Sequence, residues 1–285
     1  MRDYATPVAF RAAVEARLRE RARQLSAPAY MVRRQAALER LLARLSVVAP
    51  DRWALKGGMG LEARLGDRAR VSIDLDADHV HGAEAARADL QRAALEDAGD
   101  HFGFALVGSE ELRDEGVRLA VRYHMESQLA GKPFEPIQID VTFAPPDPWD
   151  AELQWRPGLL TGLGLDPLRL LLVPLERQVA EKLHAYTRTY RSGATTRAKD
   201  LVDLLLICQY MQVDTDLLQA AIQRVFLRRA THPVPERLSG PPTALAVAYR
   251  REARGISTAA ELEEAHRQLA EWLNPVLAKI HGLAR

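Results

Sequence analysis

The stretch WALKGGMGLEARLGDRARVSIDLD, residues 53–76, decides the fold of this chain. A short apolar run precedes Gly57 and Gly58, and apolar residues at helical spacing follow the pair. This order predicts a helix that begins at the two glycines, because glycine allows close backbone approach and a helix N-terminus attracts anions. The first half of the stretch therefore predicts a phosphate cradle.

The second half of the stretch alternates apolar and polar residues. The polar positions are Ser72, Asp74 and Asp76, and the positions between them are apolar. On a β-strand, this period of two places the carboxylates of Asp74 and Asp76 on one face. Two like charges side by side are unfavourable unless a cation neutralises them, and Mg2+, which prefers oxygen ligands, is the simplest choice. The segment therefore predicts a strand that carries a metal site.

A Gly-Gly pair, a short helix and then the motif R-x-S-x-D-L-D at residues 70–76 occur in an order that resembles the nucleotidyltransferase fold family, the DNA polymerase β-like superfamily. More narrowly, the chain is similar to the AbiEii/MenT-type toxins of bacterial toxin–antitoxin and phage-defence systems. The resemblance extends from about Trp53 to Ile207. It implies an α+β fold, in which a nucleotidyltransferase-type mixed sheet is accompanied by N-terminal helices and a C-terminal helical bundle.

Composition is that of a globular protein with one large or two modest domains. The chain has 285 residues, of which 47% are hydrophobic and 27% are charged. We expect residues 1–160 to form the nucleotidyltransferase catalytic domain with its N-terminal helices, and residues 161–285 to form a mainly helical domain that completes the nucleotide site. The absence of a bilayer-length apolar run, the N-terminus without a signal-peptide core and the single Cys208 favour a cytoplasmic protein with no membrane partner.

Arginine is abundant in the two helices predicted between residues 7 and 48. One interpretation is a solvated helix face with i,i+4 pairs, such as Glu15 with Arg11. The other is a surface that contacts RNA phosphates. The net charge of the whole chain is only +1, so any nucleic-acid binding has to come from a local patch of this kind.

A third acid lies on a later strand. Residues 116–126 and 136–143 are β-rich and alternate, and Asp140 is the only carboxylate of the second segment. Taken alone, Asp140 is explained equally well as a solvent-facing residue of an edge strand. It also matches the third acidic position of the resembled family, and three carboxylates from two neighbouring strands suit a two-metal phosphoryl-transfer site. The proline-rich residues 144–157 that follow predict an ordered loop between the two halves.

The second half of the chain carries a lysine and two acids at helical positions. By pattern alone, Lys182 in the helix predicted over residues 175–186 snorkels beside the core, and Asp200 and Asp203 belong to an ordinary charged helix start. The segments around them resemble the third and fourth motifs of the AbiEii-like toxins. That resemblance implies that Lys182 contacts the triphosphate and that Asp200 holds Lys182 or the loop carrying Arg197, with Asp203 second in line for that role. Cations around the polar loop at residues 189–196 would screen phosphate charge.

Together these residues predict a Mg2+-dependent nucleotidyltransferase that moves a nucleoside monophosphate from an NTP to an acceptor hydroxyl and releases pyrophosphate. Asp74, Asp76 and Asp140 would bind the metal. The phosphates would be held by Lys56, Gly57, Gly58, Ser72 and Lys182. The chain departs from the family at Met59, where Ser or Thr commonly follows the glycine pair, so one side-chain contact to a phosphate or metal is missing.

The resemblance also implies the acceptor. Relatives of this type add nucleotides to the 3′ acceptor end of tRNA and so block translation, which would make the chain a growth-arresting toxin with a cognate antitoxin protein. Two alternatives stay open on the sequence alone. One is a nucleotidyltransferase that modifies a protein or a small molecule, and the other is a non-catalytic module that binds nucleotides or RNA.

Overall fold

The computed structural model describes residues 4, 6–114, 117–143, 150–188, 197–256, 259 and 261–282. Contacts divide the chain into two compact units. The first consists of Met1–Arg64 and Val71–Val173, and the second of Leu65–Arg70 and Pro174–Arg285. A short insert from the first half of the chain thus belongs to the second unit.

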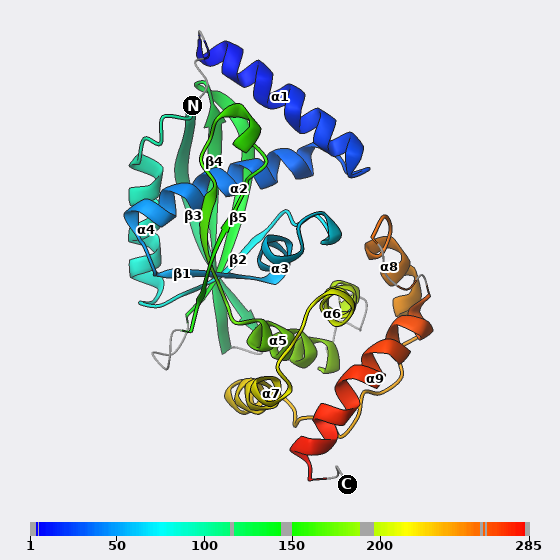
Figure 1. Ribbon diagram of the computed structural model, residues 1–285. Helices are drawn as coiled ribbons and strands as arrows, with labels where there is room; N and C mark the ends of the chain where they lie inside the picture. Colours follow the sequence, from blue (N-terminus) through cyan, green and yellow to red (C-terminus); the bar gives the residue numbers. More distant parts are fainter. Residues whose placement is uncertain are drawn as a thin grey trace. The chain divides into compact units, whose positions relative to one another are not determined.

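A seven-stranded mixed sheet dominates the described part of the first unit, with strand order β3-β4-β5-β2-β1-β7-β6 (Figure 1). The central strand β2 runs antiparallel to β1 and parallel to β5, and β1 runs parallel to β7. This confirms the predicted mixed sheet. The strands are β1 (Trp53–Lys56), β2 (Leu75–His79), β3 (Phe102–Asp114), β4 (Val117–Leu129), β5 (Lys132–Phe143), β6 (Glu152–Arg156) and β7 (Leu168–Leu172).

Two strand predictions need correction. Residues 71–74 lie before β2 and not on it, because the ladder with β5 begins at the pair Leu75 and Ile139 and gives the earlier residues no partner. Within the segment predicted as a loop, residues 152–156 form β6, which pairs with β7 along its whole length. Residues 144–149 of that loop lie outside the described part of the chain.

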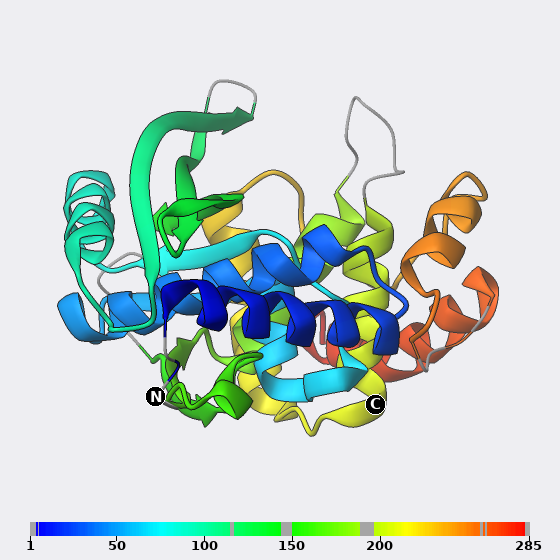
Figure 2. The same ribbon diagram turned by 90° about the horizontal axis from the view of Figure 1, so that it is seen from above.

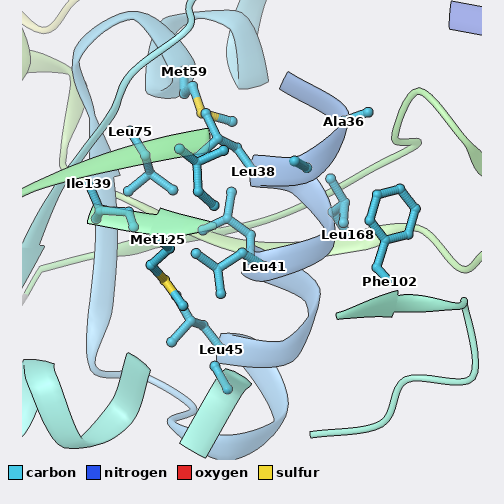
Figure 3. Close-up of a cluster of buried hydrophobic side chains, with 14 of the residues drawn as sticks. Ala36, Leu38, Leu41, Leu45, Met59, Leu75, Phe102, Met125, Ile139 and Leu168 are labelled. Carbon is cyan, nitrogen blue, oxygen red and sulfur yellow. The ribbon is translucent and has the colours of Figure 1, made fainter. Parts of the chain in front are cut away.

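Helices α1 (Pro7–Gln24) and α2 (Ala29–Val48) form the predicted N-terminal pair and lie side by side (Figure 2). Helix α1 begins where Thr6 caps it by accepting a hydrogen bond from the Ala9 N–H at 3.1 Å. Helix α2 places Leu38, Leu41 and Leu45 in the core against the sheet (Figure 3). The remaining helices of this unit are α3 (Gly57–Leu65) and α4 (Ala83–Leu95).

Arginines of these two N-terminal helices are used inside the first unit. Arg11 donates to the Leu129 carbonyl at 2.7 Å, and Arg33 donates to Glu15 and Glu135 at 2.7 Å. Arg44, with 1% of its side chain exposed, donates to both oxygens of the buried Asp100. Arg11, Arg33 and Arg44 therefore tie these helices to the sheet and its hairpins. The predicted i,i+4 pair of Arg11 with Glu15 is present at 3.6 Å, and Arg19 and Arg23 are exposed, as on a solvated helix face.

The second unit is helical, as predicted for the C-terminal part of the chain. Its long helix α9 carries Leu269, Leu273 and Leu277 inward and accommodates Pro275 in its interior. None of the described helices is long and apolar enough to cross a membrane. The helices are α5 (Leu175–Thr187), α6 (Ala198–Tyr210), α7 (Thr215–Arg229), α8 (Leu245–Glu252) and α9 (Leu262–Ile280).

Candidate functional site

A row of charged residues crosses five neighbouring strands of the sheet. Its members are paired in register from β1 to β3, and directly paired residues project from the same face of a sheet. Two acids stand side by side in the middle of the row, with a cation on each flank. In order, the row consists of Lys56, Asp76, Asp140, Arg122 and Glu110.

The glycine pair begins a helix at the end of this row. Helix α3 starts at Gly57, whose φ of 60° lies in the left-handed region that favours glycine. A Cβ atom at Gly57 would lie 2.9 Å from both Cβ and Cγ of Asp76 and closer still to Oδ2. Only glycine therefore fits between the start of α3 and the Asp76 carboxylate. Met59 points into the hydrophobic core with 5% exposure, so the position that commonly carries Ser or Thr contributes packing here (Figure 3).

Lys56 is fixed by a residue that the sequence analysis did not single out. Its Nζ donates to Asp78 Oδ1 at 2.8 Å and to Thr142 Oγ1 at 2.5 Å, and Asp78 is fully buried. Asp78 follows Asp76 by two residues, so the alternation that links Asp74 and Asp76 extends to it and was the available signal. The ammonium group of Lys56 is thus held beside the acids of the row by a hydrogen-bonded anchor.

Asp140 is paired with an arginine on the next strand. Arg122 Nε donates to Asp140 Oδ1 at 2.7 Å, and Arg122 Nη2 donates to Asp140 Oδ2 at 2.8 Å. These hydrogen bonds raise the pKa of Arg122 further above its ordinary value. The two-pronged geometry is the strong form of an Arg–carboxylate pair, and it occupies both oxygens of the third predicted acid.

Asp74 and Ser72 lie in the irregular segment before β2. The Ser72 hydroxyl, largely buried, donates to the Asp74 backbone carbonyl at 3.2 Å. Among the described residues, no group of three or more His, Cys, Asp or Glu side chains is arranged to hold a metal ion. Asp74, Asp76 and Asp140 are therefore not gathered around one point, because Asp74 precedes the strand and Asp140 is turned to Arg122.

The donor chemistry of the row nevertheless fits a divalent cation such as Mg2+. Asp76 and Asp140 are register partners on parallel strands, and like charges in that relation repel each other. Their oxygens are the ligands that Mg2+ prefers. Gly57 keeps the place beside the Asp76 carboxylate clear of a side chain.

A second charged cluster is buried inside the second unit. Lys182 on α5 donates to Asp203 Oδ2 at 2.6 Å and lies 3.7 Å from Asp200 Oδ1. Burial alone would lower the pKa of Lys182, but the charges of Asp203 and Asp200 outweigh burial and hold that pKa above its usual range. Asp203 is thus the nearer partner of the lysine and Asp200 the farther one, the reverse of the predicted order.

Asp203 binds a further cation that the sequence did not reveal. Arg70 Nε and Nη2 donate to the two oxygens of Asp203 at 2.9 and 3.0 Å. Burial would raise the pKa of Asp203, but Lys182 and Arg70 together hold it below its ordinary value. Arg70 is the first residue of the R-x-S-x-D-L-D motif, and its position within that motif was the only available signal.

Arg197 and Asp200 meet at the start of α6. Arg197 Nη1 donates to Asp200 Oδ2 at 3.2 Å, so the predicted partners are in contact. Residues 189–196, the loop expected to bring further cations, lie outside the described part of the chain. Lys182, Arg70 and Arg197 thus surround Asp200 and Asp203, and the formal charge of this five-residue cluster is +1.

A mixed sheet that carries acids on neighbouring strands, beside a helix that begins at a glycine pair, defines the nucleotidyltransferase class. The solved structure of MenT4, a nucleotidyltransferase toxin from Mycobacterium tuberculosis H37Rv, has this fold. It superposes with a TM-score of 0.55 at 19% sequence identity and covers 96% of this chain and 99% of that one. No curated protein sequence matches the chain.

Residues 40–275 match the family model of the AbiEii nucleotidyl transferase toxin of type IV toxin–antitoxin systems. The chain belongs to this family. It is therefore a nucleotidyltransferase and a toxin-type protein, which implies an NTP substrate and an antitoxin partner. The alternative of a non-catalytic binding module is set aside by this membership.

Proposed function

We propose that this enzyme is Mg2+-dependent and transfers a nucleoside monophosphate from an NTP to the 3′ acceptor end of tRNA, releasing pyrophosphate and blocking translation in the cytoplasm. The observation that carries the proposal is the pair of register-matched acids, Asp76 and Asp140, beside the glycine-started helix α3. Family membership supports the reaction class. The tRNA acceptor follows from the resemblance to AbiEii/MenT-type toxins.

In this proposal the acids of the row bind the cation. Asp76 and Asp140 would hold it from β2 and β5, and Asp74 would join them from the segment before β2. When bound, a divalent ion neutralises charge that develops on the transferring phosphoryl group. Asp140 would also position the acceptor hydroxyl, because it lies at the β4 side of the acid pair.

The start of α3 supplies the phosphate contacts. The backbone N–H groups of Gly57 and Gly58 belong to a helix N-terminus, where the helix dipole favours an anion. Lys56 adds a positive charge at the same end, fixed in place by Asp78 and Thr142. We assign Ser72 a supporting role in phosphate binding, since its hydroxyl holds the segment that carries Asp74.

The resemblance to the AbiEii-like toxins supports a role for Lys182 as a positive point charge that contacts the triphosphate. Lys182 keeps its proton because Asp203 and Asp200 raise its pKa. Asp203 would position Lys182, and Asp200 would position Arg197 at the end of the neighbouring loop. The charged Lys182 side chain, held in position by two acids, suits phosphate binding. Lysine binds phosphate as a point charge and does not need the fixed two-pronged geometry of arginine.

The test is to incubate the purified protein with total tRNA, Mg2+ and each labelled NTP in turn. Asp76→Asn is the test variant, and Asp166→Asn, which changes an exposed acid in the same unit, is the matched control. We expect label on tRNA from one NTP with the wild type and the control, and none with Asp76→Asn. Label on a protein or small molecule in place of tRNA would move the function to the alternative acceptor class.

A further inference from the structure

The ion pair between Arg122 and Asp140 competes with the use proposed for Asp140. A carboxylate that binds a divalent cation presents one or both oxygens to it, and each Asp140 oxygen already accepts a hydrogen bond from the guanidinium, at 2.7 and 2.8 Å. Two separate donor nitrogens hold the carboxylate plane in a fixed orientation. The pair therefore sets where the Asp140 oxygens point when no cation is bound.

Charges around Arg122 supply it with other partners. On β3, its register partner is Glu110, whose side chain is 56% exposed and also contacts His124 at 3.3 Å. Asp74 contributes to the electrostatic environment of Arg122 as well. If Asp140 turns to a cation, the guanidinium remains beside Glu110, its register partner, so giving up Asp140 does not leave it without a nearby acid.

The Arg122–Asp140 pair is also accessible, unlike the pair between Arg70 and Asp203. The side chains of Arg122 and Asp140 are 31% and 20% exposed, whereas Asp203 is fully buried. Exchange of partners at an accessible pair does not require a buried charge to lose its counter-ion, which is the costly event for ion pairs in protein interiors. Arg122 thus holds Asp140 firmly, but Asp140 can exchange Arg122 for another cation.

We propose that Arg122 is a positioning residue that acts as the internal counter-ion of the metal site, holding Asp140 until a divalent cation displaces it. This inference rests on the proposed function, because it takes Asp76 and Asp140 as the metal ligands. Arg122 then weakens the binding of the free ion and keeps two adjacent acids from repelling each other in the metal-free protein. On the other flank of the acid pair, Lys56 adds a positive charge that Asp78 and Thr142 hold in place.

The test is a titration of the full-length protein with Mn2+, followed by the EPR signal of the free ion, and with Mg2+ followed by calorimetry. Arg122→Gln removes the fork and the charge, and Arg122→Lys keeps a charge but cannot form the fork. Arg113→Gln, on β3, is the control for a simple loss of positive charge, because Arg113 pairs with Glu111 and not with Asp140. Circular dichroism of each variant establishes that it is folded.

We expect Arg122→Gln to bind Mn2+ about fivefold more tightly than the wild type, the scale of a partly exposed charge pair. Arg122→Lys should fall between the two, and Arg113→Gln should bind as the wild type does. In an Asp140→Asn background the effect of Arg122→Gln should vanish, since the two residues no longer compete through the same carboxylate.

Binding that Asp76→Asn abolishes but that Arg122→Gln leaves unchanged or weakens would overturn the role of Arg122 and leave the proposed metal site standing. An equal effect of Arg122→Gln in the Asp140→Asn background would also overturn it, because the arginine would then act through general electrostatics. If no variant shows Mn2+ binding that depends on Asp76, the metal part of the proposed function fails, and the inference fails with it.

Discussion

Two Arg–Asp pairs of the same two-pronged geometry lie in different surroundings. In the first unit, Arg122 and Asp140 join neighbouring strands and are 31% and 20% exposed. In the second unit, Arg70 binds Asp203, which is fully buried and also forms an ion pair with Lys182. Because the first pair is partly exposed, either side chain can change its ionic partner at low cost in free energy. In the second pair, loss of one partner would leave a buried charge without a counter-ion. We infer that identical contacts serve exchange in one unit and rigid positioning in the other.

A third buried acid shows what happens without enough counter-charge. Glu62 on α3 shares Arg156 with Glu39: the guanidinium lies 3.5 Å from Glu62 and 3.4 Å from Glu39. Burial, together with the neighbouring Glu39, raises the pKa of Glu62 to about 7. Asp203 is buried more completely than Glu62 but contacts two cations, and its pKa is lowered. The number of cations in contact, and not burial itself, decides which acid stays charged.

The largest effect is expected from removing the charge of Asp203. Asp203→Asn leaves Lys182 and Arg70 buried beside a neutral amide, which should lower the free energy of unfolding by roughly 3–5 kcal/mol. Asp200→Asn is the control, because Asp200 is 16% exposed and lies farther from Lys182. Urea unfolding followed by circular dichroism measures both. Equal losses for the two variants would contradict the central position of Asp203.

The next effect depends on pH and has the opposite sign. The pKa of Glu62 is about 7 in the folded protein and about 4.5 when unfolded, so the folded state holds its proton more tightly and stability falls as pH rises from about 4.5 to 7. Glu62→Gln removes this titration and should be more stable than the wild type by up to about 3 kcal/mol at pH 8, with little gain at pH 4.

The control for Glu62 is Glu84→Gln, which changes an exposed acid at the start of α4 in the same unit. Arg156, Arg21, Glu39 and Gln35 face Glu62 from α1, α2 and β6, and they are unchanged in both variants. Thermal unfolding at both pH values provides the comparison. A gain for Glu62→Gln that is the same at pH 4 and pH 8 would contradict a raised pKa as its cause.

The glycine at the start of α3 has a smaller expected effect on stability and a specific one on activity. Gly57 and Gly66 have φ values of 60° and 59°, but a Cβ at Gly57 meets Asp76, whereas one at Gly66 meets nothing within 4 Å. Both alanine variants should lose about 1 kcal/mol through the backbone, and Gly57→Ala about 1–2 kcal/mol more through the contact. Only Gly57→Ala should lose nucleotide transfer, measured with labelled NTP. Matching losses in both variants would count against the close approach.

The sequence predicted local features of the site and missed its long-range partners. The helix start at Gly57 and the alternation that exposes Asp140 depend on neighbours in the chain, so composition and period reveal them. The choice of Arg122 as partner for Asp140 depends on the register between β4 and β5, and the choice of Arg70 for Asp203 depends on tertiary packing. Neither leaves a periodic signal. The start of β2 at Leu75 was missed for the same reason, since pairing with β5 begins only there, four residues after the alternation starts at Val71.

The smallest effect separates the two Arg–Asp pairs directly. Arg122→Gln should change the free energy of unfolding of the metal-free protein by no more than about 1 kcal/mol, because its pair is partly exposed and screened. Arg70→Gln removes one of two cations from the buried Asp203 and should cost more, about 1–3 kcal/mol.

Unfolding at low and high salt measures both variants beside the wild type. The cost of Arg122→Gln should shrink at high salt, because exposed charges are screened over a Debye length, and the cost of Arg70→Gln should persist. If both costs respond to salt alike, the two pairs do not differ in the way that their burial indicates, and the division between an exchangeable pair and a fixed one is lost.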